Sequence, residues 1–186
     1  MYDLIIIGSG PAGSSAAIFS ARAKQKVLVI DSDQSQTKSA WVENHYGVLA
    51  MTGLDLLETG KIQAEKFGAK FVEDKVINIM SHDETVKVVT ESETIEAKAI
   101  ILATGKVMEF AEKAGINVKE TKHPRQKKII EVDSKGRTNI PNVWAAGVCS
   151  GAFIQTIVTA GEGAKVALQI ISEMKGSRYL DHDEMC

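Results

Sequence analysis

The stretch Leu4-Ile5-Ile6-Ile7-Gly8-Ser9-Gly10-Pro11-Ala12-Gly13 opens the chain, and a second apolar run, Val27–Ile30, ends in Asp31, eighteen residues after Gly13. An apolar strand, a turn with spaced glycines, a helix and a second strand ending in an acidic residue are typical of a dinucleotide-binding βαβ unit. The glycines make the turn, admit a pyrophosphate to the backbone and let the helix pack on the strand. We therefore predict a pyrophosphate site at the N-terminus of this first helix, where free N–H groups and the helix dipole attract anions.

Asp31 has two interpretations. At the end of the second strand its carboxylate is placed to accept hydrogen bonds from a ribose diol, and it would repel a 2′-phosphate at the same position. The alternative is a residue that only caps the end of the strand. The first interpretation predicts an adenosine half without a 2′-phosphate.

Composition bounds the class of protein. The 186 residues are 44% apolar and 25% charged with a net charge of −2, which predicts one globular domain and gives no reason to expect nucleic acid or an anionic membrane as a partner. The first strand begins almost at Met1 and no apolar stretch is long enough for a bilayer, so we expect a cytoplasmic protein without a signal peptide. Cysteine occurs only at Cys149 and Cys186, with no C-x-x-C and no metal-ligand spacing, so no metal site is predicted.

Hydropathy patterns place the remaining elements. Residues 32–53 show no clean period and are expected to form a functional loop, and residues 70–97 are expected to add one strand to the main sheet and form a small antiparallel β-meander. The pattern predicts an α/β fold with a central parallel sheet. Helices are expected at Ala12–Ala23, Leu54–Phe67 and Phe153–Met174, and further strands at Ala99–Ala103, Lys128–Val132 and Val143–Ala146.

Three motifs in a fixed order carry a family resemblance: Gly8–Gly13, then Ala103-Thr104-Gly105 after a buried strand, then Pro141–Gly147 before the last helix. Together they resemble the FAD domain of the thioredoxin-reductase-like (pyridine nucleotide-disulphide oxidoreductase) flavoproteins. One G-x-G-x-x-G is weak evidence, whereas three motifs in register across the chain are much stronger. Further matches are Glu43–Gly47, Thr52–Leu56, Gln155–Ile157 and Ala160–Gly163.

The resemblance implies a Rossmann-like FAD/NAD(P)-binding three-layer fold. Residues 1–186 would be a single FAD-binding domain, with the nucleotide-binding unit at 1–31, the meander at about 70–97 and a flavin-side helix at about 153–175 whose N-terminus faces the flavin pyrimidine carbonyl. The family's FAD domains form homodimers, so the resemblance also implies a homodimer. Its cofactor residues would be Gly8, Gly10, Pro11, Ala12 and Gly13 at the pyrophosphate, Asp31 at the ribose, Val76 at the adenine, and Asn44, Gly105, Gly147 and Gln155 around the flavin and ribityl chain.

The sequence departs from the family pattern where the flavin would bind. Val148 stands where the family has an Asp that bonds the ribityl chain, and His45-Tyr46 replaces an aromatic-Pro pair. The loop between Asp31 and Asn44 lacks the family's Gly-Gly-Gln-hydrophobic segment, and no second G-x-G-x-x-G and no dithiol follow. The chain as given is therefore not an ordinary thioredoxin reductase.

Several residues have both a functional and a structural interpretation. His45 is a weak candidate for a proton donor beside the flavin or a turn residue that fills the place of proline, and Cys149 is a weak candidate for a redox thiol or a small buried hydrophobe. Trp41 and Tyr46 would cover a flavin ring or pack under their own loop, and Cys186 belongs to an acidic tail. The basic stretch would dock an acidic redox partner or a nicotinamide phosphate, or be a solvated loop; it comprises Lys119, Lys122, His123, Arg125, Lys127 and Lys128.

These observations favour a minimal FAD-binding flavoprotein that carries out electron transfer, with a redox partner protein or NAD(P)H supplied in trans. The competing hypothesis is a non-catalytic FAD- or nucleotide-binding module, a sensor or subunit that has lost the chemistry. A third, an NAD-dependent dehydrogenase, is weaker because no acid–base pair follows the single βαβ unit.

Overall fold

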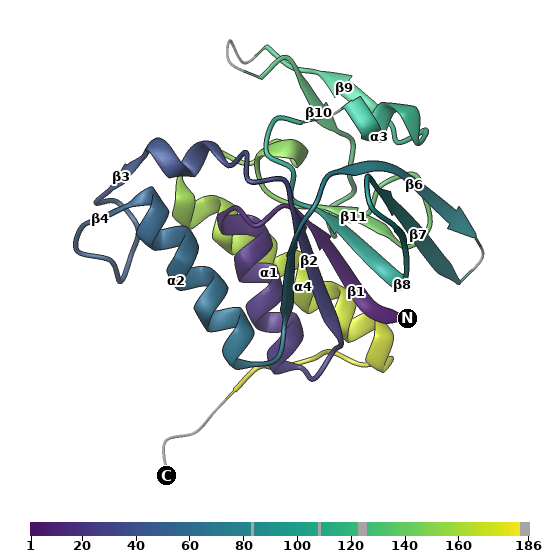
Figure 1. The fold of residues 1–186 in the computed structure, drawn as a ribbon, viewed down its shortest axis with the longest axis horizontal. Coiled ribbons are helices and arrows are strands. Elements are labelled where there is room, and N and C mark those ends of the chain that lie inside the picture. Colours follow the sequence, from purple (N-terminus) through teal and green to yellow (C-terminus); the bar gives the residue numbers. More distant parts are fainter. Residues whose placement is uncertain (83, 108, 123–125, 183–186) are drawn as a thin grey trace.

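The computed structural model describes residues 1–82, 84–107, 109–122 and 126–182. Its centre is a seven-stranded sheet in which six strands follow the order β5-β2-β1-β8-β7-β6 and β11 also pairs with β8 (Figure 1). Parallel pairs join β1 to β2 and β8, β2 to β5, and β8 to β11, whereas β6, β7 and β8 pair antiparallel. The strands are β1 Tyr2–Ile7, β2 Val27–Asp31, β5 Lys70–Glu73, β6 Val76–His82, β7 Thr85–Thr90, β8 Thr94–Leu102 and β11 Val143–Ala145.

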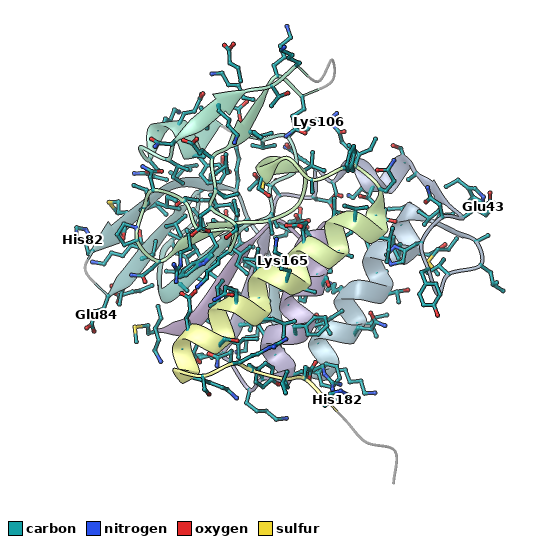
Figure 2. The ribbon with its side chains drawn as sticks, turned by 180° about the vertical axis from the view of Figure 1, so that it is seen from behind. Glu43, His82, Glu84, Lys106, Lys165 and His182 are labelled. Atoms are coloured by element: carbon teal, nitrogen blue, oxygen red, sulfur yellow. The ribbon has the colours of Figure 1, made fainter. Side chains whose placement is uncertain are left out.

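Two hydrophobic cores lie on opposite faces of this sheet. Because side chains alternate along a strand, Leu4 and Ile6 of β1 join one core, and Ile5 and Ile7 join the other. The first core is covered by α1 (Pro11–Arg22) and α4 (Thr156–Lys175), with α2 (Gly53–Lys66) packed beside α1 (Figure 2). The sheet and these helices are two layers of the three-layer α/β fold that the family resemblance implies.

The third layer is smaller and covers the second core. It contains α3 (Glu109–Lys113), β9 (Val118–Glu120) and β10 (Lys128–Ile130), and it lies at the top of Figure 1. Phe110, Ile116 and Ile130 are buried and join the second core. Neither α3 nor β9 was expected from the sequence, because both are short and depend on these tertiary contacts.

The loop from residue 32 to 52 contains short elements that lead into α2: the turn η1 (Gln36–Ser39) and the strands β3 (Trp41–Val42) and β4 (Met51–Thr52). Thr52 caps α2, because its Oγ1 accepts from the backbone N–H of Asp55 at 3.1 Å. A Cβ on Gly53 would lie 1.6 Å from the Thr37 carbonyl oxygen, so glycine lets α2 begin directly against η1.

Two expectations about the elements need correction. The end of the expected meander and the expected strand Ala99–Ala103 form one strand, β8 (Thr94–Leu102), whose first half pairs with β7 and whose second half pairs with β11. The meander is therefore continuous with the central sheet. The last helix begins at Thr156 instead of Phe153, after a short turn, η2 (Val148–Ser150).

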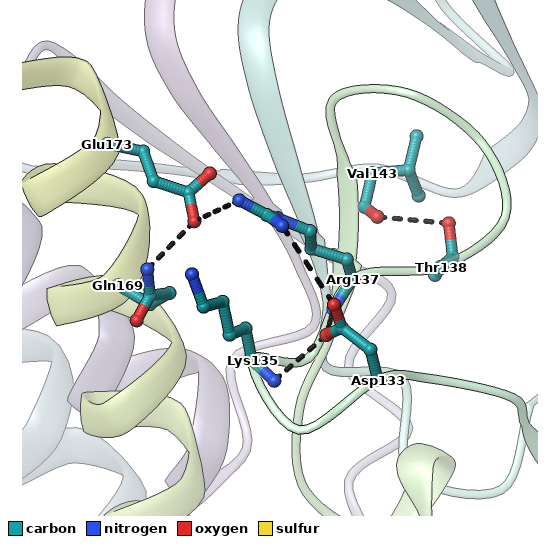
Figure 3. A network of polar contacts seen from close by, with 7 residues as sticks. All are labelled: Asp133, Lys135, Arg137, Thr138, Val143, Gln169 and Glu173. Carbon is teal, nitrogen blue, oxygen red and sulfur yellow. Dashed lines mark hydrogen bonds and ion pairs between the residues drawn. The ribbon is translucent and has the colours of Figure 1, made fainter. Parts of the chain in front are cut away.

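A polar network holds the loop before β11 against the C-terminal half of α4 (Figure 3). Arg137 Nη2 lies 2.6 Å from Glu173 Oε1, and Gln169 Nε2 donates to the same oxygen at 2.8 Å. Asp133 accepts from the backbone N–H groups of Lys135 and Arg137. The network fixes one end of the segment that connects the third layer to β11.

Candidate functional site

The turn after β1 is closely packed at two of its glycines. Gly8 has φ +100°, and a Cβ there would lie 2.5 Å from the carbonyl oxygen of Ala103, at the end of β8. A Cβ on Gly13 would lie 1.9 Å from the Gly8 carbonyl oxygen. These glycines let β1, β8 and α1 approach one another more closely than any side chain would permit.

The N-terminus of α1 opens onto this turn. Gly10 is the N-cap, Pro11 is the first helical residue, and no side chain caps the first turn. A Cβ on Gly10 would meet only Ser35 Oγ, at 3.7 Å. The geometry therefore leaves room beside Gly10 for a ligand phosphate, and the helix dipole supplies positive potential there.

Asp31 ties the end of β2 to the glycine turn. Its Oδ1 accepts from the backbone N–H of Ser9 at 3.1 Å, and its Oδ2 accepts from Asp33 N–H at 3.2 Å. These hydrogen bonds support a structural role for Asp31 at the end of β2. They also place its half-buried carboxylate beside the predicted pyrophosphate site. The Asp31 carbonyl accepts from Asp74 N–H at 3.0 Å, which positions Val76 two residues further on, at the start of β6.

Two further strand ends meet at the same edge of the sheet. Gly105 follows β8 with φ +63°, and a Cβ there would have no neighbour within 4 Å. Gly147 follows β11 with φ +85°, and a Cβ there would lie 2.8 Å from the Cβ of Ala12. The turns after β1, β8 and β11 therefore surround the N-terminus of α1, as expected for a ligand site at the carboxyl ends of parallel strands.

The loop at residues 43–47 contacts the N-terminus of α4. His45 Nδ1 lies 2.9 Å from Oγ1 of Thr156, the first residue of this helix. Partial burial lowers the pKa of His45 below its usual value of 6.5, which favours the neutral imidazole beside the positive end of the helix. Asn44 and the N-cap Gln155 are both exposed, so their side chains are available to a ligand.

Cys149 is fully buried in η2, seven residues before α4 begins. Its Sγ donates to the carbonyl oxygens of Leu102 at 3.1 Å and Ala146 at 3.3 Å. Burial raises the pKa of this thiol, which disfavours the nucleophilic thiolate. The surroundings support the interpretation of Cys149 as a small buried hydrophobe. Cys186, His123 and Arg125 lie outside the described residues.

Two contacts at the site escaped the sequence analysis. Gln126, in the third layer, donates through Nε2 to the Val148 carbonyl oxygen at 2.6 Å. Gly163 lies against α1, since a Cβ there would be 2.0 Å from the Ala12 carbonyl oxygen. Gly163 belongs to the Ala160–Gly163 match, but neither contact could be expected from a local pattern, because each joins segments far apart in the chain.

The described residues fit the adenosine and pyrophosphate parts of FAD better than its ribityl part. The open backbone at Gly10 and the carboxylate of Asp31 lie at one sheet edge. At the predicted ribityl position the half-buried Val148 supplies no side-chain hydrogen bond.

Within the described chain no group of three or more His, Cys, Asp or Glu side chains could hold a metal ion, and no described helix is long and apolar enough to cross a membrane.

Comparison with known proteins gives a consistent family. A thioredoxin reductase from Listeria innocua is 31% identical over 168 residues, which cover 88% of this chain and 47% of that enzyme, so the chain spans about half the length of this relative. Among solved structures, the atypical thioredoxin reductase TRi of Desulfovibrio vulgaris Hildenborough matches with a TM-score of 0.80 at 23% identity, covering 95% of this chain and 99% of that one.

A ferredoxin-flavin thioredoxin reductase from Clostridium acetobutylicum matches with a TM-score of 0.75 at 21% identity, covering 95% of this chain and 99% of that one. These two structures show a shared fold. The sequence model of one family, pyridine nucleotide-disulphide oxidoreductase, matches residues 2–124 and 63–164. The chain therefore belongs to the pyridine nucleotide-disulphide oxidoreductase family and is similar to the FAD domain of thioredoxin reductases.

Proposed function

We propose that this chain is a single-domain FAD-binding flavoprotein that takes its electrons from a donor supplied in trans. The observation that carries the proposal is the meeting of the turns after β1, β8 and β11 at the N-terminus of α1, where Gly8 packs against Ala103 and Gly147 packs against Ala12. The family match supports FAD as the cofactor, and bound FAD would supply two-electron chemistry.

The chain's own residues divide the work of holding FAD. Gly8, Gly10, Pro11, Ala12 and Gly13 would hold the pyrophosphate through the backbone, Asp31 the ribose and Val76 the adenine. Asn44, Gly105, Gly147 and Gln155 would line the flavin end, where the N-terminus of α4 stabilises negative charge.

A separate donor is proposed because the chain as given carries one G-x-G-x-x-G and no C-x-x-C. The segment between Gly105 and β11 forms only the small third layer in the described residues. The ferredoxin-flavin thioredoxin reductase found among the structural matches supports a protein as a donor for this fold. NADH and NADPH are the alternative donors.

A visible spectrum of the purified protein tests this function. We expect a yellow protein, or a colourless one that becomes yellow on addition of FAD, and released ligand that chromatographs as FAD. NADH, NADPH and dithionite are then added separately under anaerobic conditions, and loss of flavin absorbance is followed. A protein that stays colourless and fails to bind added FAD would contradict the proposed function.

The second candidate function is a non-catalytic FAD- or nucleotide-binding module. Val148 favours it, because a lost hydrogen bond to a charged group weakens binding by about 1.5–3 kcal/mol. The two functions differ in turnover. A protein that binds FAD but passes no electrons from any donor to any acceptor is a non-catalytic binding module. Tighter binding of NAD than of FAD in calorimetry would instead indicate an NAD-dependent dehydrogenase.

A further inference from the structure

The β9–β10 hairpin lies over the turn that follows β11. Ile130 of β10 is fully buried in the core beneath the hairpin. Its neighbour Ile129 points the other way, because its Cδ1 lies 2.9 Å from the position of a Cβ on Gly151, at the end of η2. One face of the hairpin therefore packs into the protein, and the other faces η2.

Two lysines share the face that points toward η2. Lys119 is directly opposite Ile129 in the antiparallel register, and directly opposed residues lie on the same face. Lys127 precedes Ile129 by two residues, and its carbonyl oxygen accepts from Thr121 N–H at 2.7 Å, which continues the ladder. Both lysines are exposed, and neither forms an ion pair with a described residue. By contrast, Lys128 on the opposite face is paired with Glu112.

The segment that links η2 to α4 carries exposed apolar side chains. Two and three residues after Gly151, the side chains of Phe153 and Ile154 are 76% and 55% exposed. Tyr46 is 93% exposed and follows His45, which contacts the first residue of α4. Large exposed apolar groups that gather at one place mark interaction sites more often than isolated ones do.

We propose that this face docks a small acidic electron-carrier protein, with Phe153 and Ile154 at the centre of the interface and Lys119 and Lys127 at its rim. An apolar centre with a charged rim is the usual anatomy of a transient protein interface, and lysines steer an acidic partner into place. The proposal rests on the proposed function, because the face adjoins the predicted flavin end at Gly147 and the N-terminus of α4.

Charge decides which occupant we favour. In a two-fold dimer built on this face, the lysines of one copy would meet only residues of the same face, and the residues named above include no carboxylate to pair with them. An acidic carrier instead offers carboxylates to them. Each reduced carrier gives up one electron, so two carriers together with two protons from solvent convert bound FAD to FADH2, and both carriers leave oxidised.

The test uses the FAD-loaded protein and a reduced, acidic bacterial ferredoxin as the probe. Stopped-flow absorbance measures the second-order rate constant of flavin reduction. We expect Lys119→Gln/Lys127→Gln to lower this constant about tenfold at low salt and to flatten its dependence on ionic strength. The matched control is Lys70→Gln/Lys87→Gln, which removes the same charge from exposed lysines on β5 and β7 and should change the constant less than about twofold.

Separate measurements distinguish this proposal from the proposed function. Fluorescence titration gives the FAD affinity of each variant, and dithionite reduction gives its reactivity without docking; both should be unchanged. Calorimetry with oxidised ferredoxin measures docking without any electron transfer, and Phe153→Ser should weaken it about tenfold. Failure to bind FAD contradicts the proposed function, whereas FAD binding without ferredoxin binding contradicts only the docking proposal.

A second copy of the chain is tested by sedimentation equilibrium. If the protein is a dimer that Phe153→Ser dissociates, and ferredoxin binds neither form, this face is a dimer interface and the proposal is wrong. Equal rate constants for the two double-lysine variants would also overturn it.

Discussion

At the scale of single residues, the contact between α1 and α4 depends on the absence of one side chain. A Cβ on Gly163 would lie 2.0 Å from the backbone carbonyl oxygen of Ala12, which has no flexible end that could move away. Gly161 is on the same helix, and a Cβ there would have no neighbour within 4 Å. The close approach of α1 and α4 therefore requires glycine at position 163, whereas position 161 has room for a side chain.

We expect Gly163→Ala to lower the free energy of unfolding by about 1–3 kcal/mol, because the two helices must separate to admit the methyl group. Gly161→Ala is the control, and it should raise the free energy of unfolding by about 0.5–1 kcal/mol, since alanine loses less backbone entropy in a helix. Urea unfolding followed by circular dichroism measures both. Equal effects of the two substitutions would show that the helices do not make this close approach.

His45 gives the protein a pH dependence of predictable sign. Partial burial lowers its pKa in the folded state below the usual 6.5, so the unfolded chain binds the proton more tightly. The stability contributed by neutral His45 is therefore fully present above pH 6.5 and is lost as the pH falls through the folded-state pKa. An NMR titration should place its midpoint below 6.5, and His45→Gln should remove this part of the pH dependence. A midpoint above 6.5 would be incompatible with a desolvated ring.

At the scale of elements, the long strand β8 shows what local patterns leave open. Its residues 94–97 pair with β7 in the meander and its residues 100–102 pair with β11 in the parallel sheet. The exposed Lys98 between them separates the two runs in the sequence and gives them the appearance of two strands. The start of α4 was misplaced for a related reason, because Phe153 and Ile154 are apolar but exposed. A hydropathy pattern indicates which residues are buried. In these two segments the buried residues do not coincide with the bounds of the strand or helix, so the pattern misplaces those bounds.

The Arg137 network joins the loop before β11 to α4, two segments far apart in the sequence. Because it contains an ion pair, the dependence of its stabilising effect on salt tests its contribution. Arg137→Ala should lower the free energy of unfolding by about 1 kcal/mol at low salt, because the pair with Glu173 is part of a network yet lies near solvent. The difference should shrink at about 1 M salt, where screening is strong. Lys165→Ala is the control; its pair with Glu162 spans 3.6 Å within one exposed helix turn, and we expect a change below about 0.5 kcal/mol. A loss that is independent of salt would mean that Arg137 acts through packing.

At the scale of the whole molecule, the glycine turn could be predicted and its partners could not. Gly8–Gly13 and Asp31 belong to one local βαβ unit, so spacing alone was enough to place them. The contact of His45 with Thr156 spans 111 positions, and that of Gln126 with Val148 joins the third layer to η2. These contacts depend on how the layers pack, which no window of sequence contains. They also lie at the predicted flavin end, where the sequence departs from the family pattern.

This division predicts that the α1 turn with Asp31 binds the ADP part of FAD independently of the residues at the predicted flavin end. ADP should stabilise the protein through the α1 turn and Asp31, raising the melting temperature as its concentration rises above its Kd. Val148→Asp places a carboxylate at the predicted ribityl position and should tighten FAD binding about tenfold to a hundredfold, while leaving the ADP affinity within about twofold. Val72→Asp, at a partly exposed position on β5, is the control and should change neither affinity. Fluorescence titration with FAD and thermal shift with ADP separate the outcomes. If Val148→Asp tightens both ligands equally, the substitution acts on the fold, and the ribityl position lies elsewhere in the chain.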